Sequence, residues 1–275
     1  MNREKITSRE YKVILRKEHF VGDERQLLKA SKAFWQSFKQ VAVDIVLDSE
    51  GDLEKIVDRR EIQLYDTKKQ LFYNKNYIFR ERYDVLTHKR EVTLKFRHLD
   101  RYVSQDRDMK ANNHSEKGYK FEEDIKSPFL VLYSFSSTQT IPIDENFSKV
   151  RDVLRLYPSL SDEFTNYNED ENIKSVGNII LEIVLKGAKF RIRKNPQLDC
   201  KCALIVWYAK DDDEKPVVVE FSFRYGDDSE NYTKKASQRA YDVFYKLQHK
   251  LEDWVDIESE TKTSYIYKVA QGVIK

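Results

Sequence analysis

Residues 76–85, NYIFRERYDV, decide the fold of this chain, because charged and apolar side chains alternate along them. Successive side chains of a β-strand point to opposite faces, so Arg80 and Arg82 share one face while Phe79 and Glu81 take the other. A charged face is ordinary for a sheet that meets solvent. The same alternation recurs on other segments of the chain, however, and the question becomes where all these charged faces point.

Outward from this stretch, seven further segments have strand-like patterns. They are SREYKVILRK (8–17), EIQLYDT (61–67), REVTLKFRHL (90–99), GYKFEEDI (118–125), NIILEIVLKGAKFRIRK (178–194), CKCALIVWYAK (200–210) and PVVVEFSFRYG (216–226). The sequence therefore predicts a mainly β (α+β) chain with eight strands.

Helical spacing of apolar residues predicts amphipathic helices over 24–47, with Asp23 as N-cap, and over 233–255. A shorter helix around Val150–Tyr157 should end before Pro158. We expect one domain over 1–275 with helical insertions near 24–60 and 126–175. The polar segment 100–117 predicts a loop, and the tail, TSYIYKVAQGVIK, a short terminal strand.

Charged residues recur on one face of most of these strands. They are Glu10 with Lys12, Lys95, Lys120 with Glu122 and Asp124, and Lys189 with Arg191 and Arg193. Glu220 is hardest to explain as a solvent-facing charge, because three Val precede it and two Phe follow closely. A charge in such surroundings must meet a partner, an ion or water. A closed barrel, which sends alternate residues into its lumen, would satisfy all of them together.

Both signs of charge in one lumen suit a metal–polyphosphate complex. Mg²⁺ or Mn²⁺ takes carboxylate and phosphate oxygens, while guanidinium groups grip the remaining phosphate oxygens. The chain as a whole has almost no net charge, since 49 basic residues nearly cancel 47 acidic ones. General attraction to nucleic acid or membrane is therefore not indicated.

Other signals place the protein in the cytoplasm and exclude several kinds of site. Cys200 and Cys202 predict buried free thiols, since a lone Cys-x-Cys pair without a nearby His makes a poor zinc site. The chain has no apolar run long enough to cross a membrane and no apolar core of a signal peptide near its start. A glycine-rich phosphate loop is also missing, and the five His are scattered.

Several motifs, in order and at suitable spacing, resemble those of the CYTH superfamily of triphosphate tunnel metalloenzymes. The first strand of that family carries Glu-x-Glu-x-Lys, where this chain has Ser8, Glu10 and Lys12. The matches that follow are Tyr65-Asp66-Thr67, Leu71, Arg80-x-Arg82, Thr93-Leu94-Lys95, the altered set Lys120, Glu122 and Asp124, and Glu220 followed by Ser222.

The resemblance implies a closed antiparallel eight-stranded barrel, or tunnel, with accessory helices. It implies phosphate binding by Lys12, Arg80, Arg82, Lys95, Lys120, Arg191 and Arg193, and it leaves open which of Lys186, Lys189, Arg191 or Arg193 takes the place of the basic residue on the sixth strand. It also implies a divalent metal, Mg²⁺ or Mn²⁺, held by Glu10, Glu122, Asp124 and Glu220, with Glu10 and Glu220 as the catalytic pair. The activity expected from it is hydrolysis of inorganic triphosphate or of a nucleoside or organic triphosphate.

Two departures from the family pattern leave other functions open. Ser8 and Ser222 each stand where a metal-binding Glu is expected, and a hydroxyl is a weak, neutral ligand for a hard cation. One alternative is a polyphosphate- or nucleotide-binding module without turnover. Others are ATP cyclisation and a purely structural barrel. RNA binding is disfavoured by carboxylates on the same faces, apart from recognition of a 5′-triphosphate end.

Overall fold

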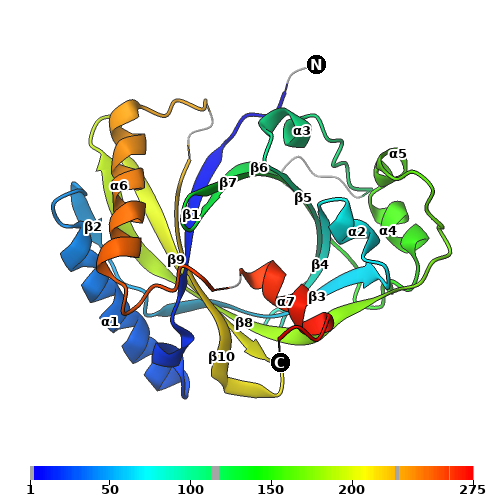
Figure 1. Cartoon of the computed structure of the whole chain (residues 1–275), viewed down its shortest axis with the longest axis horizontal. Coiled ribbons are helices and arrows are strands. Elements are labelled where there is room, and N and C mark those ends of the chain that lie inside the picture. Colours follow the sequence, from blue (N-terminus) through cyan, green and yellow to red (C-terminus); the bar gives the residue numbers. More distant parts are fainter. Residues whose placement is uncertain (1–2, 113–117, 227–228, 260, 275) are drawn as a thin grey trace.

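The computed structural model describes residues 3–112, 118–226, 229–259 and 261–274, and it forms a closed β-barrel with helices outside it (Figure 1). The strands are β1 (Ser8–Leu15), β2 (Asp48–Glu50), β3 (Lys55–Thr67), β4 (Tyr77–Asp84), β5 (Arg90–His98), β6 (Tyr119–Lys126), β7 (Leu130–Thr140), β8 (Ile173–Arg193), β9 (Leu198–Ala209) and β10 (Asp212–Tyr225). The helices are η1 (Lys17–Phe20), α1 (Glu24–Ala42), α2 (Leu71–Asn74), α3 (Arg101–Gln105), α4 (Val150–Leu156), α5 (Leu160–Glu163), α6 (Lys234–Lys250) and α7 (Lys262–Ala270).

The sheet runs in the order β2-β8-β3-β4-β5-β7-β6-β1-β10-β9, and a further pairing of β8 with β9 closes it. Nine strands therefore form the barrel, and β2 is an extra strand on β8. The predicted closed, mainly β barrel is confirmed, with two corrections. The barrel has one more strand than predicted, β7, and β1 pairs with β6 in parallel, so the sheet is mixed rather than wholly antiparallel.

Sequence patterning missed β7 because its inward face carries small hydroxyl side chains, Ser134, Ser136 and Thr138, instead of charges. The predicted insertion over 126–175 thus contains a barrel strand as well as α4 and α5. The predicted terminal strand is also wrong, since that segment forms α7. The predicted loop over 100–117 contains α3, and its residues 113–117 lie outside the described part of the chain.

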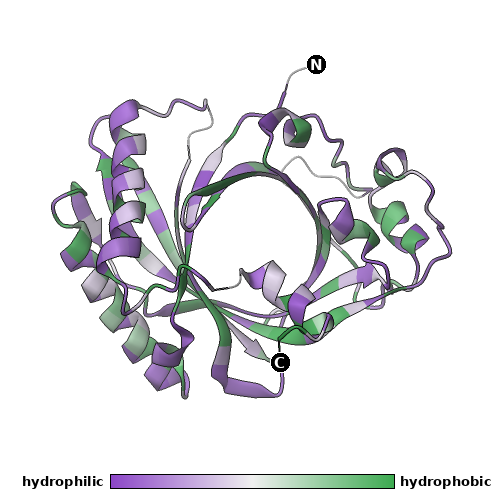
Figure 2. Cartoon of the chain, viewed as in Figure 1, coloured by the Kyte–Doolittle hydropathy of each residue, from purple (hydrophilic) through white to green (hydrophobic). Residues whose placement is uncertain are grey.

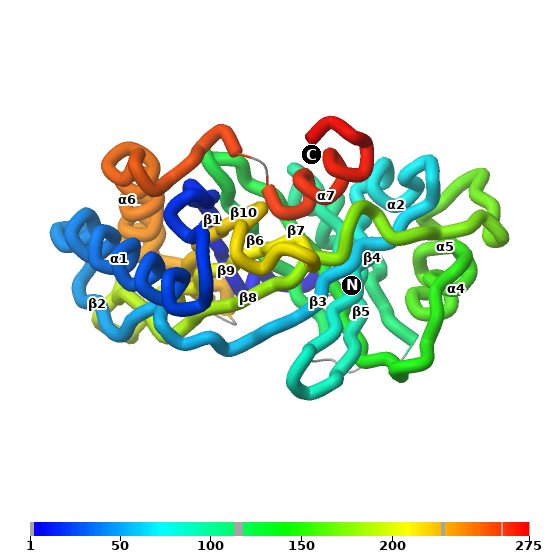
Figure 3. The backbone as a smooth tube through the Cα atoms, turned by 90° about the horizontal axis from the view of Figure 1, so that it is seen from below, coloured from blue at the N-terminus to red at the C-terminus, as the bar shows by residue number. Residues whose placement is uncertain are grey.

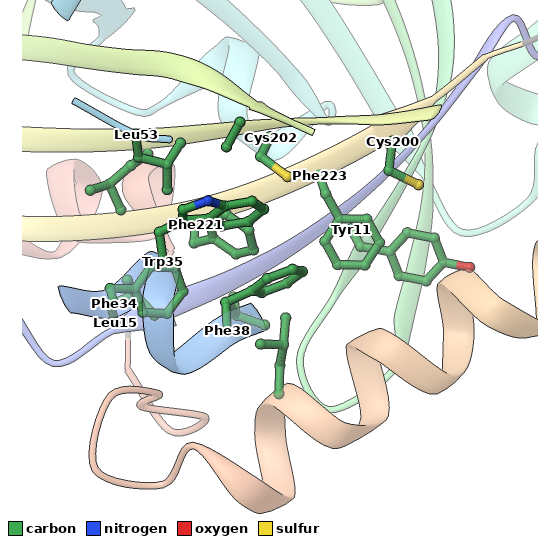
Figure 4. Packing of buried hydrophobic residues seen from close by; sticks show 14 of the residues in the cluster. Tyr11, Leu15, Phe34, Trp35, Phe38, Leu53, Cys200, Cys202, Phe221 and Phe223 are labelled. Atoms are coloured by element: carbon green, nitrogen blue, oxygen red, sulfur yellow. The ribbon is translucent and has the colours of Figure 1, made fainter. Parts of the chain in front are cut away.

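One hydrophobic layer joins α1 and α6 to the outer faces of β1, β8, β9 and β10 (Figure 4). Trp35 stacks on Phe38 with ring centroids 4.7 Å apart, and Phe34 meets the edge of Phe221 at 4.9 Å. Cys200 and Cys202 are buried free thiols in this layer, as predicted. Asp23 caps α1 by accepting a hydrogen bond from the backbone N–H of Gln26 at 2.9 Å.

A second layer covers the opposite side of the barrel, where α2, α4 and α5 lie near β4 and β5 (Figure 1). Phe79, Phe96 and Tyr157 are buried in it, and the Tyr157 hydroxyl donates to the backbone oxygen of Val92 at 3.0 Å. Hydrophilic and hydrophobic residues alternate along the strands around the lumen (Figure 2). Many apolar side chains of these strands pack outward under the helices, while charged ones such as Lys12, Arg80 and Lys95 point into the interior.

The last helix, α7, lies across one mouth of the barrel (Figure 3). Its Ile266 and Tyr267 are buried against an apolar floor inside the barrel. That floor consists of Ile62, Leu64, Val176, Ile180, Trp207 and Val218. In the described residues, none of the helices is both long and apolar enough for a transmembrane span.

Candidate phosphate-binding tunnel

The barrel encloses a cavity of about 260 Å³ with a strongly basic lining. Its cations are Lys12, Arg80, Arg82, Lys95, Arg97, Lys120, Lys126 and Lys262, and its carboxylates are Glu10, Glu122 and Glu220. Thr93, Ser136, Thr138 and Trp207 contribute polar groups between them. The predicted tunnel residues of β1, β4, β5, β6 and β10 are thus brought to one space, in which cations outnumber carboxylates.

The guanidinium groups of Arg80 and Arg82 carry donors without a partner in the described part of the chain. The Nε atoms of both are buried without a hydrogen-bond partner among the described residues. Burial, reinforced by the neighbouring Arg82, holds the pKa of Arg80 well below its usual value. Burial likewise lowers the pKa of Arg82, although Glu182 opposes this effect. Two unpaired guanidinium donors in a confined space are suited to an anion that accepts from both.

A buried carboxylate, Asp124, organises the cations of the neighbouring wall. Its oxygens lie 2.8 Å from the Lys12 Nζ, 3.3 Å from the Lys95 Nζ and 3.4 Å from the Arg97 Nε, and the Ser134 hydroxyl donates to it at 2.6 Å. Burial would raise the pKa of Asp124, but the three cations hold it well below its usual range. Asp124 is therefore not itself a cavity-lining residue, and it holds these cations in place from behind the cavity wall.

Each carboxylate of the predicted metal set lies beside a cation of the protein. Glu10 is 2.9 Å from the Lys12 Nζ, Glu220 is 2.9 Å from the Lys262 Nζ, and Glu122 contacts Lys120. Burial would raise the pKa of Glu10, but Lys12 lowers it to about 2.

In the described part of the chain, no three carboxylate, imidazole or thiol groups converge on a point where they could hold a metal ion. Ser8 and Ser222 share the inward faces of Glu10 and Glu220 by strand alternation, and both are buried. Their hydroxyls are neutral, so they add no negative charge that would help Glu10 and Glu220 to bind a cation. As arranged, these side chains do not fit Mg²⁺ or Mn²⁺, and the metal stays a prediction.

Two lysines of the cavity have pKa values near neutrality. Burial lowers the pKa of Lys95 to about 7, against the attraction of Asp124 and with help from Arg97. Burial lowers the pKa of Lys126 to about 8, and Arg97 adds to this effect. The positive charge of the lumen therefore decreases as the pH rises through this range.

Arg191 and Arg193 do not line the cavity, so the structure does not bring them to the predicted phosphate site. The pairing of β8 shifts between Lys186 and Lys189, and the strand then runs past the barrel to pair with β2 and β9. Arg191 forms ion pairs there with Asp199 at 2.9 Å and with Glu50 at 3.1 Å. Arg193 donates to the backbone oxygen of Pro196.

The structure adds tunnel residues that the sequence analysis missed. Arg97 and Lys126 follow Lys95 and Asp124 by two positions on the same strands, so strict alternation would have found them. Lys262 could not be found in this way, because it lies on α7. Glu182 of β8 is also buried, and it accepts from Arg60 at 2.7 Å and from the Trp207 indole at 2.8 Å.

The Tyr-Asp-Thr motif is structural in this molecule. Asp66 is buried and accepts from the backbone N–H groups of Phe72 and Tyr73 at the start of α2, each at 3.0 Å. The hydroxyl of Tyr267 on α7 donates to the same carboxylate at 3.0 Å. Asp66 thus connects β3, α2 and α7 and helps hold α7 across the tunnel mouth.

No model of a known protein family matches the chain, and no curated protein matches it. Among solved structures, it resembles a candidate adenylyl cyclase from Hippeastrum described as having a dominant triphosphatase activity. The two share 12% identity over 96% of each chain, with a TM-score of 0.46.

Two bacterial structures, both of candidate adenylate cyclases, are also similar. The Bacillus halodurans protein shares 13% identity, with a TM-score of 0.41, and the Vibrio parahaemolyticus protein 8%, with a TM-score of 0.35. Each comparison covers 96% of this chain and 98% of the other. At such identities and scores, these likenesses carry no conclusion about the activity of this chain.

Proposed function

We propose that the tunnel binds the phosphate chain of inorganic triphosphate, or of a nucleoside or organic triphosphate. The observation that carries this proposal is the convergence of eight cationic side chains on one enclosed cavity, two of them with unpaired guanidinium donors. An isolated cluster of like charges is costly to bury. A polyanion removes that cost, because each phosphate group brings both negative charge and several acceptor oxygens.

The test of binding is calorimetry with inorganic triphosphate, comparing the wild-type protein with the double variant Arg80→Gln/Arg82→Gln. Removing two charge-assisted contacts should weaken binding about a hundredfold or more. Arg191→Gln is the matched control, because Arg191 lies outside the cavity, and it should bind like wild type. Equal affinity of the double variant and the wild type would refute the site.

We further propose that the bound chain is hydrolysed. Fixed cations in a confined site stabilise the negative charge that spreads over a phosphoryl group during transfer. Glu10 and Glu220 face the same cavity, and Glu10 is ionised at neutral pH. These carboxylates can accept hydrogen bonds from a water molecule and orient it toward phosphorus.

Turnover is tested by phosphate release from inorganic triphosphate, ATP, GTP and thiamine triphosphate, with Mg²⁺ or Mn²⁺ and with EDTA. Glu220→Gln should abolish release and leave the fold intact. Cyclic AMP is measured in the ATP reaction, since cyclisation is the competing outcome. Binding without release of either product would identify a binding module instead of an enzyme.

A further inference from the structure

Lys262 lies beside Glu220, one of the carboxylates that the sequence analysis assigned to a divalent metal. Its Nζ is 2.9 Å from Glu220, whose side chain is 7% exposed, and 5.6 Å from the centre of the Trp207 ring. Arg82 lowers the pKa of Glu182 to about 2 against the effect of burial, and Lys262 and Arg60 add to this effect. The Lys262 ammonium group therefore pairs with Glu220 on β10 and also contributes to the positive field at Glu182 on β8.

The start of α7 holds this ammonium group in a defined place. The Thr261 side chain caps the helix by accepting from the backbone N–H of Ser264, and Thr261 and Thr263 both line the cavity beside Lys262. One turn later, Ile266 and Tyr267 anchor the helix in the apolar floor, with the Tyr267 hydroxyl donating to Asp66. Lys262 is thus presented to the lumen by a fixed helix, not by a free tail.

We propose that Lys262 replaces a divalent cation at Glu220, so that the tunnel binds a phosphate chain without Mg²⁺ or Mn²⁺. This inference rests on the proposed binding function and specifies its cofactor requirement. An ammonium group has three donors, so Lys262 can contact Glu220 and still donate to a phosphate oxygen. Lys12 likewise lies between two carboxylates, Glu10 on its own strand, β1, and Asp124 on the neighbouring strand, β6.

The chemistry of the remaining donors supports this inference. Mg²⁺ requires close octahedral oxygen coordination, and Mn²⁺ likewise takes hard oxygen donors. Here one inward neighbour of each carboxylate along its strand is a hydroxyl, Ser8 beside Glu10 and Ser222 beside Glu220, and the other is Lys12 or Val218, so neither strand supplies a second carboxylate at these positions. A divalent ion at Glu220 would also have to displace the Lys262 ammonium or lie beside it, and like charges repel strongly in a partly desolvated cavity.

The test is calorimetry with inorganic triphosphate in excess EDTA and then with free Mg²⁺ in excess over the ligand. The wild-type protein should bind in EDTA, and Mg²⁺ should not strengthen binding. Lys262→Ala should bind about tenfold more weakly in EDTA, the loss expected for one charge-assisted contact. Mg²⁺ should restore part of that affinity in Lys262→Ala alone, because Glu220 is then free to bind a cation.

Two further variants separate charge from helix packing. Lys262→Arg keeps the charge and should retain metal-free binding, and Lys268→Ala, on the same helix but outside the cavity lining, should behave like wild type. Wild-type binding that needs Mg²⁺ would overturn this inference and leave the proposed function standing. Full-affinity binding by Lys262→Ala in EDTA would also overturn it. No binding in either condition would instead refute the proposed function.

Discussion

At the residue scale, the lysines of the tunnel differ in the direction of their pKa shifts. Lys12 lies between Glu10 and Asp124, and although burial opposes protonation, these carboxylates raise its pKa. Among the described residues, Lys95 has one ion-pair partner, the shared Asp124 at 3.3 Å, and burial lowers its pKa to about 7. Lys12 is therefore a permanent charge, whereas Lys95 gains its charge only as the pH falls below about 7.

This difference predicts a pH-dependent affinity. Only protonated Lys95 attracts phosphate, so binding of inorganic triphosphate should weaken, up to about tenfold, as the pH rises from about 6.5 to about 8.5. Calorimetry across this range measures the slope. Lys95→Arg, which stays charged throughout, should show a shallower slope, and this comparison cancels the protonation of the ligand itself. Equal slopes in the two proteins would contradict the assignment to Lys95.

At the element scale, one buried carboxylate, Asp66, adds a polar attachment of α7 to the barrel beside the packing of Ile266 and Tyr267 on the apolar floor. The Asp66 carboxylate accepts hydrogen bonds from two backbone N–H groups of α2 and from the Tyr267 hydroxyl. It also accepts one from the backbone N–H of Thr67 at 2.8 Å. Burial raises the pKa of Asp66 in spite of these hydrogen bonds. One of the motifs in the resemblance to a tunnel family, Tyr65-Asp66-Thr67, thus helps secure the helix that carries Lys262.

Removing this carboxylate should destabilise the protein. We expect Asp66→Ala to lower the free energy of unfolding by about 2–3 kcal/mol, because several buried donors lose a charged acceptor. Tyr267→Phe, which loses one hydrogen bond, should cost about 1 kcal/mol. Urea unfolding measures both. The double variant should lose little more than Asp66→Ala alone, and strictly additive losses would show that the two groups are not coupled.

At the scale of the whole molecule, the tunnel and the α1–α6 layer lie on opposite faces of the same strands. Inward residues of β10 such as Glu220 line the cavity, while Phe221 and Phe223 pack outward against α1 and against Tyr11 and Phe190. The outer layer therefore maintains the curvature of strands whose other face carries the charges.

Truncating this layer should affect stability rather than recognition. Trp35 is fully buried and donates from its indole to the backbone oxygen of Gly51 at 2.8 Å. Trp35→Ala should lower the free energy of unfolding by about 3–5 kcal/mol. Val43→Ala, just after α1 at a side chain 72% exposed, should change it by less than about 0.5 kcal/mol. The affinity of both variants for triphosphate, measured below the unfolding transition, should stay within about twofold of wild type. A large loss of affinity in Trp35→Ala would mean that the outer layer shapes the binding site.

Local alternation was sufficient to find the barrel and much of its lining. Lys12, Arg80 and Lys95 lie on inward faces because a strand alternates its side chains whatever it pairs with. The hidden strand β7 shows the limit of this signal, since hydroxyl residues such as Ser136 and Thr138 carry neither strong charge nor strong hydrophobicity.

Long-range contacts decided the rest of the site. The shift in pairing before Lys189 took Arg191 out of the tunnel, and packing of α7 on the barrel floor brought Lys262 into it. The same contacts placed an ammonium group beside Glu220, where a metal was expected. Strand alternation is set by neighbouring residues, whereas register, bulges and helix docking depend on distant partners, such as Asp66 and Tyr267, which are 201 positions apart.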